Sequence, residues 1–70
     1  MTEPLYLHAT DRRSFSATVE RVLDDRVVLD RTLFYPAGGG QPSDTGILTD
    51  GRRTWRVTDV QKKDTIYHTL

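Results

Sequence analysis

The chain has seventy residues, of which 36% are hydrophobic, with ten Lys and Arg, ten Asp and Glu, and no Cys. This length predicts one small domain over residues 1–70, with a marginal core because no disulfide or cysteine-rich metal site can reinforce it. No apolar stretch approaches the roughly 20 residues that cross a bilayer. No basic-then-apolar leader follows Met1. We therefore expect neither a membrane span nor an exported precursor.

The charge balance bears on partners and on compartment. The formal net charge is zero, so the chain lacks the strong overall field that non-specific phosphate binding uses. Any contact with nucleic acid would have to be local. The absence of Cys fits a reducing compartment, and we expect a cytoplasmic protein.

The amino-terminal part of the chain predicts strands. Residues 6–7 could supply a first edge strand, and residues 14–23 predict a longer one because apolar and polar side chains alternate from Phe15. Residues 24–26 predict a tight turn, since Asp accepts turn geometry and bonds to nearby backbone amides. A second strand then begins with the apolar residues 27–29.

The same scheme recurs in the carboxy-terminal part. Asp50 and Gly51 lie between apolar segments, and an Asp-Gly pair is a strong hairpin signal because Gly reaches positive φ without steric cost. The strand before the pair includes residues 47–48, and the strand after it covers residues 53–60. A polar turn and a final strand follow, at residues 62–64 and 65–70.

These short strands predict the fold class. No segment keeps a helical apolar period over three turns, and turn signals recur every 8–12 residues or so, which is typical of small all-β barrels and sandwiches. Roughly five strands are few for a closed barrel, and an apolar strand at the chain end would leave an unpaired edge. We hypothesise that a second copy of the chain or a missing continuation covers this edge.

Residues 34–46 form the most informative segment. Three consecutive glycines, Gly38, Gly39 and Gly40, cost backbone entropy and return no packing. They therefore indicate a need for positive φ or for close approach between the backbone and a ligand. A proline on each side restricts the freedom of the segment.

Two polar residues of this loop favour a binding role. Gln41 and Asp44 place an amide and a carboxylate beside exposed backbone donors, which suits a small polar ligand or an RNA terminus. The alternative is a wide turn between two strands, with the glycines allowing a bulge. The segment is neither a P-loop nor a dinucleotide fingerprint. Chemistry alone leaves both interpretations open.

A longer run around the glycines resembles a known family. Residues 27–46 read V-V-L-D-R-T-L-F-Y-P-A-G-G-G-Q-P-S-D-T-G and resemble the glycine-rich motif of AlaX-type alanyl-tRNA editing proteins and of the alanyl-tRNA synthetase editing domain. V-T-D-V-Q-K-K-D at residues 57–64 and I-Y-H at residues 66–68 look like the same family. The resemblance covers most of the chain from about Phe15 onward.

The resemblance implies a fold, an activity and a partner. It implies a hydrolase that removes Ser or Gly wrongly attached to alanine tRNA, with an amino-terminal β-barrel similar to the barrel of translation elongation factors. In that family the glycine-rich loop lies against the editing pocket of a second, catalytic domain. By the resemblance, the loop residues that bind substrate are Gly38, Gly39, Gly40, Gln41 and Asp44, and no residue here is catalytic.

The family's metal ligands cannot be mapped onto this chain. Zinc in the family is held in the second domain by a His-x-x-x-His pair and a later Cys-x-x-x-His pair, whereas this chain has His8, His68 and no Cys. Ester hydrolysis in the family uses the metal and ordered water to stabilise an oxyanion. We therefore expect zinc only in the missing domain, and no catalysis by this chain alone. Ala37 also departs from the Thr of many relatives, so selectivity for Ser would need other groups.

The remaining candidates each have a structural alternative. His68 is expected to be a strand residue bonded to its neighbours rather than a metal ligand, and His8 is assigned no role. Trp55 is expected in the core because it shares a face with Val57. A phosphate-contacting rim, with Trp55 or Tyr67 for stacking, competes with ordinary solvated turns for the basic residues Arg12, Arg13, Arg52, Arg53, Arg56, Lys62 and Lys63.

Two functions remain open from the sequence. The first is the amino-terminal barrel of an AlaX-type editing hydrolase. The alternative is a stand-alone β-barrel that binds RNA or a protein partner without catalysis. The two differ in chemistry rather than in fold.

Overall fold

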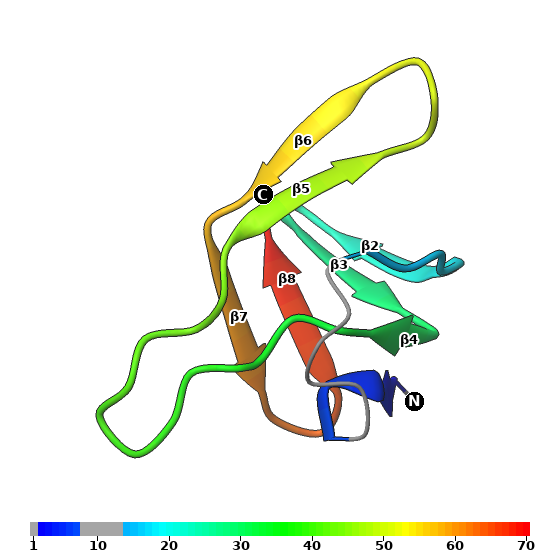
Figure 1. The fold of residues 1–70 in the computed structure, drawn as a ribbon. Coiled ribbons are helices and arrows are strands. Elements are labelled where there is room, and N and C mark those ends of the chain that lie inside the picture. Colours follow the sequence, from blue (N-terminus) through cyan, green and yellow to red (C-terminus); the bar gives the residue numbers. More distant parts are fainter. Residues whose placement is uncertain (1, 8–13) are drawn as a thin grey trace.

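The computed structural model describes residues 2–7 and 14–70, and its regular structure in these ranges is almost entirely β (Figure 1). One short 3-10 helix, η1 (Leu5–Leu7), accompanies the strands. The strands are β1 (Glu3–Pro4), β2 (Val19–Leu23), β3 (Arg26–Leu29), β4 (Arg31–Thr32), β5 (Gly46–Thr49), β6 (Thr54–Val57), β7 (Asp59–Lys62) and β8 (Ile66–Thr69). The all-β prediction is confirmed. His8, Arg12 and Arg13 lie outside the described residues.

Backbone hydrogen bonds arrange these strands in three sheets. The largest has the order β2-β3-β8-β7 and is antiparallel throughout. The expectation of an unpaired edge at the chain-end strand is wrong, because β8 lies between β3 and β7 and pairs with both. The hairpin β5–β6 forms a second sheet, and β1 pairs in parallel with β4 to form the third. The sheets of the described residues do not close into a barrel. The same residues contain no helix that is long and apolar enough to span a membrane.

The turns lie where the sequence predicts them. Asp24 has a φ of 52° in the tight β2–β3 turn, and Leu23 pairs with Arg26 across it. Gly51 has a φ of 93° in the β5–β6 turn, where Asp50 Oδ1 accepts hydrogen bonds from two backbone amides that follow it. Turn chemistry is local, so short sequence segments are sufficient to predict both hairpins.

Two predicted strands are shorter or differently placed in the structure. Residues 14–17 alternate as a strand would, yet no neighbouring strand pairs with them, and β2 begins only at Val19. Residues 6–7 lie in η1 rather than in an edge strand, and the edge pairing is made just before them by β1. The short helix brings the buried Tyr6 ring to 4.9 Å from the ring of Tyr35.

A third difference explains how the core is filled. The predicted strand over residues 53–60 is divided at Thr58, where the chain leaves β6 and enters β7. In one continuous strand, Val57 and Val60 would point to opposite faces of the sheet. The corner changes this, and both side chains are fully buried. They pack in one cluster with Tyr6, Phe34 and Ile66.

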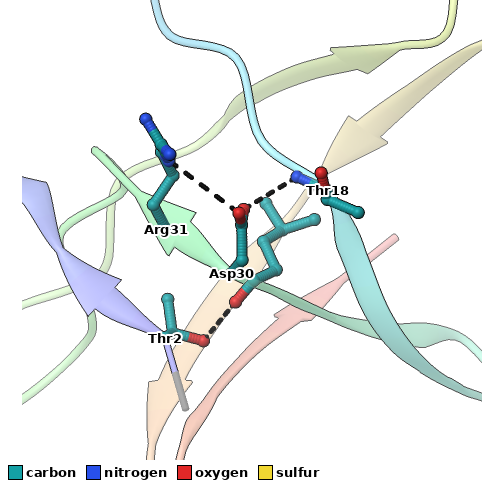
Figure 2. Close-up of polar contacts among 5 residues, drawn as sticks. Thr2, Thr18, Asp30 and Arg31 are labelled. Carbon is teal, nitrogen blue, oxygen red and sulfur yellow. Dashed lines mark hydrogen bonds and ion pairs between the residues drawn. The ribbon is translucent and has the colours of Figure 1, made fainter.

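Asp30 makes a second corner, between β3 and β4, as Figure 2 shows. Its carboxylate accepts a hydrogen bond from Thr18 N at 2.7 Å, and its own N–H donates to Thr18 O at 2.9 Å. Nearby, the buried Thr2 hydroxyl donates to Leu29 O at 2.6 Å. These bonds hold the amino-terminal segment and the start of β2 against the end of β3.

Candidate functional site

The glycine-rich loop joins β4 to β5 and is closed at its neck by a reciprocal pair of bonds. Tyr35 N donates to Asp44 Oδ2 at 3.0 Å, and Asp44 N donates to Tyr35 O at 2.9 Å. Asp44 is exposed, but its carboxylate holds the two arms of the loop together. The structure thus gives this predicted site residue a positioning contact at the neck, away from the glycines.

The tip of the loop is a tight turn. Gly38 N donates to Gln41 O at 3.2 Å, and Gln41 N donates back to Gly38 O at 2.9 Å. Gly39 and Gly40, the two central residues, have φ angles of 57° and 79°, as a type I′ turn requires. The prediction of positive φ is therefore confirmed at these two glycines but not at Gly38.

The tip is also open on its outer side. All residues from 38 to 42 are exposed, and a Cβ built on any of the three glycines would meet no atom of the described chain within 4 Å. No close approach inside this part of the chain requires them. Gly38 has neither a positive φ nor a close neighbour here, so local structure does not explain its identity.

Side chains fix the base of the loop to β7, which lies beside it in Figure 1. Ala37 N donates to Val60 O at 2.9 Å, and Val60 N donates to Ser43 Oγ at 3.0 Å. Ser43 Oγ lies 3.1 Å from Asp59 Oδ1 and donates to it. Hydrogen bonds from Gln61 and from Ser43 hold the pKa of the Asp59 carboxyl below its usual value. The loop therefore has a fixed base and an exposed tip.

A buried hydrogen-bond network joins His68 of β8 to Thr32 and Phe34, which precede the glycines. His68 is fully buried, and its Nδ1 donates to Val27 O at 3.1 Å, because a carbonyl oxygen can only accept. In the neutral ring, Nε2 then accepts from Thr32 Oγ1 at 2.9 Å, and Thr32 Oγ1 accepts from Phe34 N. Burial lowers the pKa of His68. Its predicted role as a bonded strand residue is confirmed.

The described residues do not fit a zinc site. No three His, Asp or Glu side chains within these ranges come together around a common point. Both ring nitrogens of His68 are already bonded to Val27 and Thr32.

Trp55 lies at the surface rather than in the core. Its side chain is 36% exposed and lines a groove of about 910 Å³ between β2–β3 and the β5–β6 hairpin. The prediction is wrong because β6 pairs only with β5, so this end of the hairpin extends away from the large sheet (Figure 1). Val57, at the other end of β6, reaches the core.

The basic residues that the structure describes do not form one rim. Arg52, Arg53 and Arg56 lie on the β5–β6 hairpin, whereas Lys62 and Lys63 lie at the β7–β8 turn, at the opposite end of the molecule in Figure 1. All five are exposed. The basic residues of the hairpin therefore have to be considered separately from the two lysines.

Two residues of the site carry no clear signal in the sequence. Ser43 is not a candidate from the sequence, because a Ser beside a loop Pro has no distinctive pattern. Gly46 is one of several loop glycines, yet a Cβ on it would lie 2.8 Å from Phe34 Cε1, so glycine lets β5 begin against the core. The contact between Gly46 and Phe34 forms only in the folded chain, so the sequence alone does not predict it.

Comparison with known proteins shows the family of the chain. The family model for tRNA synthetases class II (A) matches residues 3–70. The alanine–tRNA ligase of Sulfurisphaera tokodaii is 49% identical over 71 residues, which cover 99% of this chain and 8% of the ligase. The alanyl-tRNA editing protein AlaX-M of Methanosarcina barkeri is 63% identical over 49 residues, covering 69% of this chain and 20% of that protein.

A further ligase, from Pyrococcus furiosus, is 51% identical over 61 residues, which cover 87% of this chain and 7% of the ligase. The chain thus spans a fifth or less of the length of these relatives. The family model nevertheless matches all but the first two residues of the chain. The chain belongs to the tRNA synthetases class II (A) family, with the alanine–tRNA ligases and the AlaX-type alanyl-tRNA editing proteins.

Proposed function

We propose that the chain is the amino-terminal part of an editing hydrolase that removes Ser or Gly wrongly attached to alanine tRNA. The observation that carries the proposal is the loop, whose neck is held by the Tyr35–Asp44 bonds while its tip stays exposed. A protein surface fixed at its base and open at its tip is suited to contacting a ligand outside the chain. The relatives described as alanyl-tRNA editing proteins supply the substrate class.

Each loop residue receives a role in this proposal. The N–H groups of Gly39 and Gly40 make no bond within the described chain, so they are available to an oxygen at the charged 3′ end of the tRNA. Gly38 leaves room for that end, and Gln41 offers an exposed amide beside it. Asp44 acts as a positioning residue, because its carboxylate closes the neck.

The complete editing unit contains more than this chain in the proposal. A second, catalytic domain holds zinc, which activates water for ester hydrolysis when bound. That domain or a second copy of this chain covers the outer edge of β2 and completes a small barrel similar to that of translation elongation factors. The unit acts in the cytoplasm, where charged tRNA is used. A monodisperse, well-folded monomer of this chain at high concentration in sedimentation would contradict pairing with a second copy.

Deacylation of Ser-charged alanine tRNA tests the proposal. The protein produced from the reading frame extended past Leu70 should release Ser in a zinc-dependent manner, and the 70-residue chain alone should not. Release of Ser by the 70-residue chain on addition of zinc would overturn the assignment of catalysis to a second domain. No release by the extended product would overturn the proposed activity.

The second candidate is a stand-alone β module that binds RNA or protein without catalysis. It shares the fixed loop and the exposed tip with the first candidate and differs only in needing no catalytic domain. The reading frame separates the two candidates. A His-x-x-x-His followed by a Cys-x-x-x-His past Leu70 supports the hydrolase, and a stop codon directly after Leu70 supports the module.

A further inference from the structure

The arginines of the described residues fall into two groups. Three of them have partners on the large sheet or at its corner. Arg31 Nε lies 3.9 Å from Asp30 Oδ2 (Figure 2). Arg26 stacks on the Tyr67 ring at 5.0 Å. The pKa of Asp64 is lowered first by the hydrogen bond from Tyr67 and further by the positive charge of Arg21.

The other three arginines are all on one element. Arg52, Arg53 and Arg56 are exposed on the β5–β6 hairpin, and none has a side-chain ion pair or ring contact within the described chain. Among the described arginines, the three without such a partner lie within five consecutive positions, which makes the hairpin a local positive surface on a chain of zero net charge.

The one acidic side chain at this turn is directed to the backbone. Asp50 Oδ1 accepts from Arg52 N at 2.9 Å and from Arg53 N at 2.8 Å, and these bonds lower the pKa of Asp50. Its carboxylate therefore shapes the turn and leaves the guanidinium groups free. A second contact, from Thr49 Oγ1 to Arg53 O at 2.9 Å, helps to fix the turn.

We propose that the β5–β6 hairpin is a binding surface for the phosphate backbone of RNA, with Arg52, Arg53 and Arg56 as the contacting residues. Guanidinium groups match phosphate oxygens in charge and in hydrogen-bond geometry. Phosphate contacts are positional and need no base recognition, which suits a hairpin that presents cations at its tip and one face. The identification of the RNA as a tRNA rests on the proposed function, whereas the binding itself does not.

The hairpin is separate from the glycine-rich loop. In Figure 1 the β5–β6 turn and the loop tip extend in opposite directions from the sheets. Two contacts on a long RNA could therefore be made at once, one near its charged end by the loop and one on its backbone by the hairpin. Trp55 lies in β6 between Arg53 and Arg56 and is 36% exposed at the groove, so its fluorescence serves as a probe of the hairpin.

Salt-dependent binding of an uncharged, fluorescein-labelled alanine tRNA transcript to the 70-residue chain tests the proposal. Removing one phosphate-binding cation should reduce the slope of log K against log salt by roughly 0.7–0.9. The triple variant Arg52→Gln, Arg53→Gln, Arg56→Gln should therefore lower the slope by about 2 and the affinity at least about tenfold near 0.1 M salt. The matched control is Lys62→Gln with Lys63→Gln, at the other end of the molecule, which should leave the slope unchanged.

Fluorescence of Trp55, the one Trp of the chain, gives a second readout. Its emission should change when the transcript binds, and the arginine variant should not show this change while its circular dichroism stays that of the wild type. Equal slopes for the wild type and the arginine variant would overturn the proposal, and so would an equal decrease in the lysine control. Equal slopes would also indicate that the hairpin binds a protein partner rather than RNA. Because deacylation is not measured, a failure here leaves the editing proposal intact.

Discussion

At the scale of single residues, the Thr32 hydroxyl connects the motif before the glycines to the last strand. It accepts from Phe34 N and donates to Nε2 of the buried, neutral His68, so one side chain satisfies a backbone amide and a ring nitrogen. A buried donor or acceptor without a partner costs about 1–3 kcal/mol. The small core therefore depends on this network as well as on apolar packing.

The network predicts a dependence of stability on pH. Burial lowers the pKa of His68 from its ordinary value of 6.5, so the unfolded chain takes up the proton first as the pH falls. The contribution of neutral His68 to the free energy of unfolding is complete above pH 6.5. It is lost as the pH falls from there toward the lowered pKa. Urea unfolding should show a lower midpoint at pH 5.5 than at pH 7.5.

The lowered carboxyl pKa values act in a separate range. Asp59 and Asp64 have ordinary values of 3.8, lowered by hydrogen bonds, so their contribution is lost only as the pH falls through that region and below. The drop between pH 7.5 and 5.5 therefore reports on histidine. Identical urea midpoints at the two pH values would contradict the buried, neutral state of His68.

Two glycines of the loop should respond differently to a methyl group. Gly46→Ala places a Cβ 2.8 Å from Phe34 Cε1, and overpacking of this kind costs about 1–3 kcal/mol. Gly38→Ala meets nothing within 4 Å of the described chain and should stay within about 0.5 kcal/mol of the wild type. Thermal unfolding of the two variants measures the difference. Equal melting temperatures would show that the contact with Phe34 is not tight.

At the scale of elements, the loop is held to β7 by a small number of polar contacts. Ser43 Oγ accepts from Val60 N and donates to Asp59 Oδ1, and Val60 O accepts from Ala37 N. The base of the loop is therefore bonded to the large sheet through β7. Its exposed tip is positioned by its base.

Removing one of these contacts should weaken the attachment of the loop to β7. Ser43→Ala leaves the Val60 amide without its acceptor and should cost about 1–2 kcal/mol, because the group is partly buried. Hydrogen exchange at Val60 N–H should accelerate. The matched control Ser14→Ala removes an exposed hydroxyl with no bond in the described chain and should change neither quantity. Unchanged exchange at Val60 in Ser43→Ala would contradict the docking of the loop.

The sequence predicts the turns well and the strand ends poorly. Asp24 and Gly51 identify their hairpins because positive φ and side-chain-to-backbone bonds are local properties. The corner at Thr58 has no such signal, since it depends on β6 leaving one sheet for β7 to enter another. Residues 14–17 alternate correctly and still lack a strand partner. Alternation describes one strand, whereas pairing requires two.

At the scale of the whole molecule, the described chain has a compact side and an open side. The sheet β2-β3-β8-β7 and the cluster around Val57 and Val60 form the first. The groove beside the β5–β6 hairpin forms the second, and Val22, Ile47 and Trp55 are exposed along it. A surface so apolar on so small a chain is typical of an interface. The sequence places Trp55 in the core because it shares a strand face with Val57, but alternation along one strand does not show which end of the strand packs against the large sheet.

The candidate site is predictable in its location but not in its geometry. The consecutive glycines Gly38, Gly39 and Gly40 identify the loop, and they also indicate positive φ in the segment. The neck contact of Asp44 and the docking contact of Ser43 join residues that are distant in sequence, nine and seventeen positions from their partners. Such pairings require the folded chain.

In the proposed function, the exposed loop tip contacts the substrate of an editing hydrolase. Gly38→Val tests it better than Gly39→Val, because Gly39 has a φ of 57° and a side chain there would also strain the backbone. The measurement is the rate of Ser release from Ser-charged alanine tRNA by the extended protein with and without Gly38→Val, at equal zinc content and equal melting temperature. We expect the variant to be at least about tenfold slower, corresponding to about 1.4 kcal/mol less transition-state stabilisation. Equal rates for the two proteins would contradict the claim and leave the glycines as a turn.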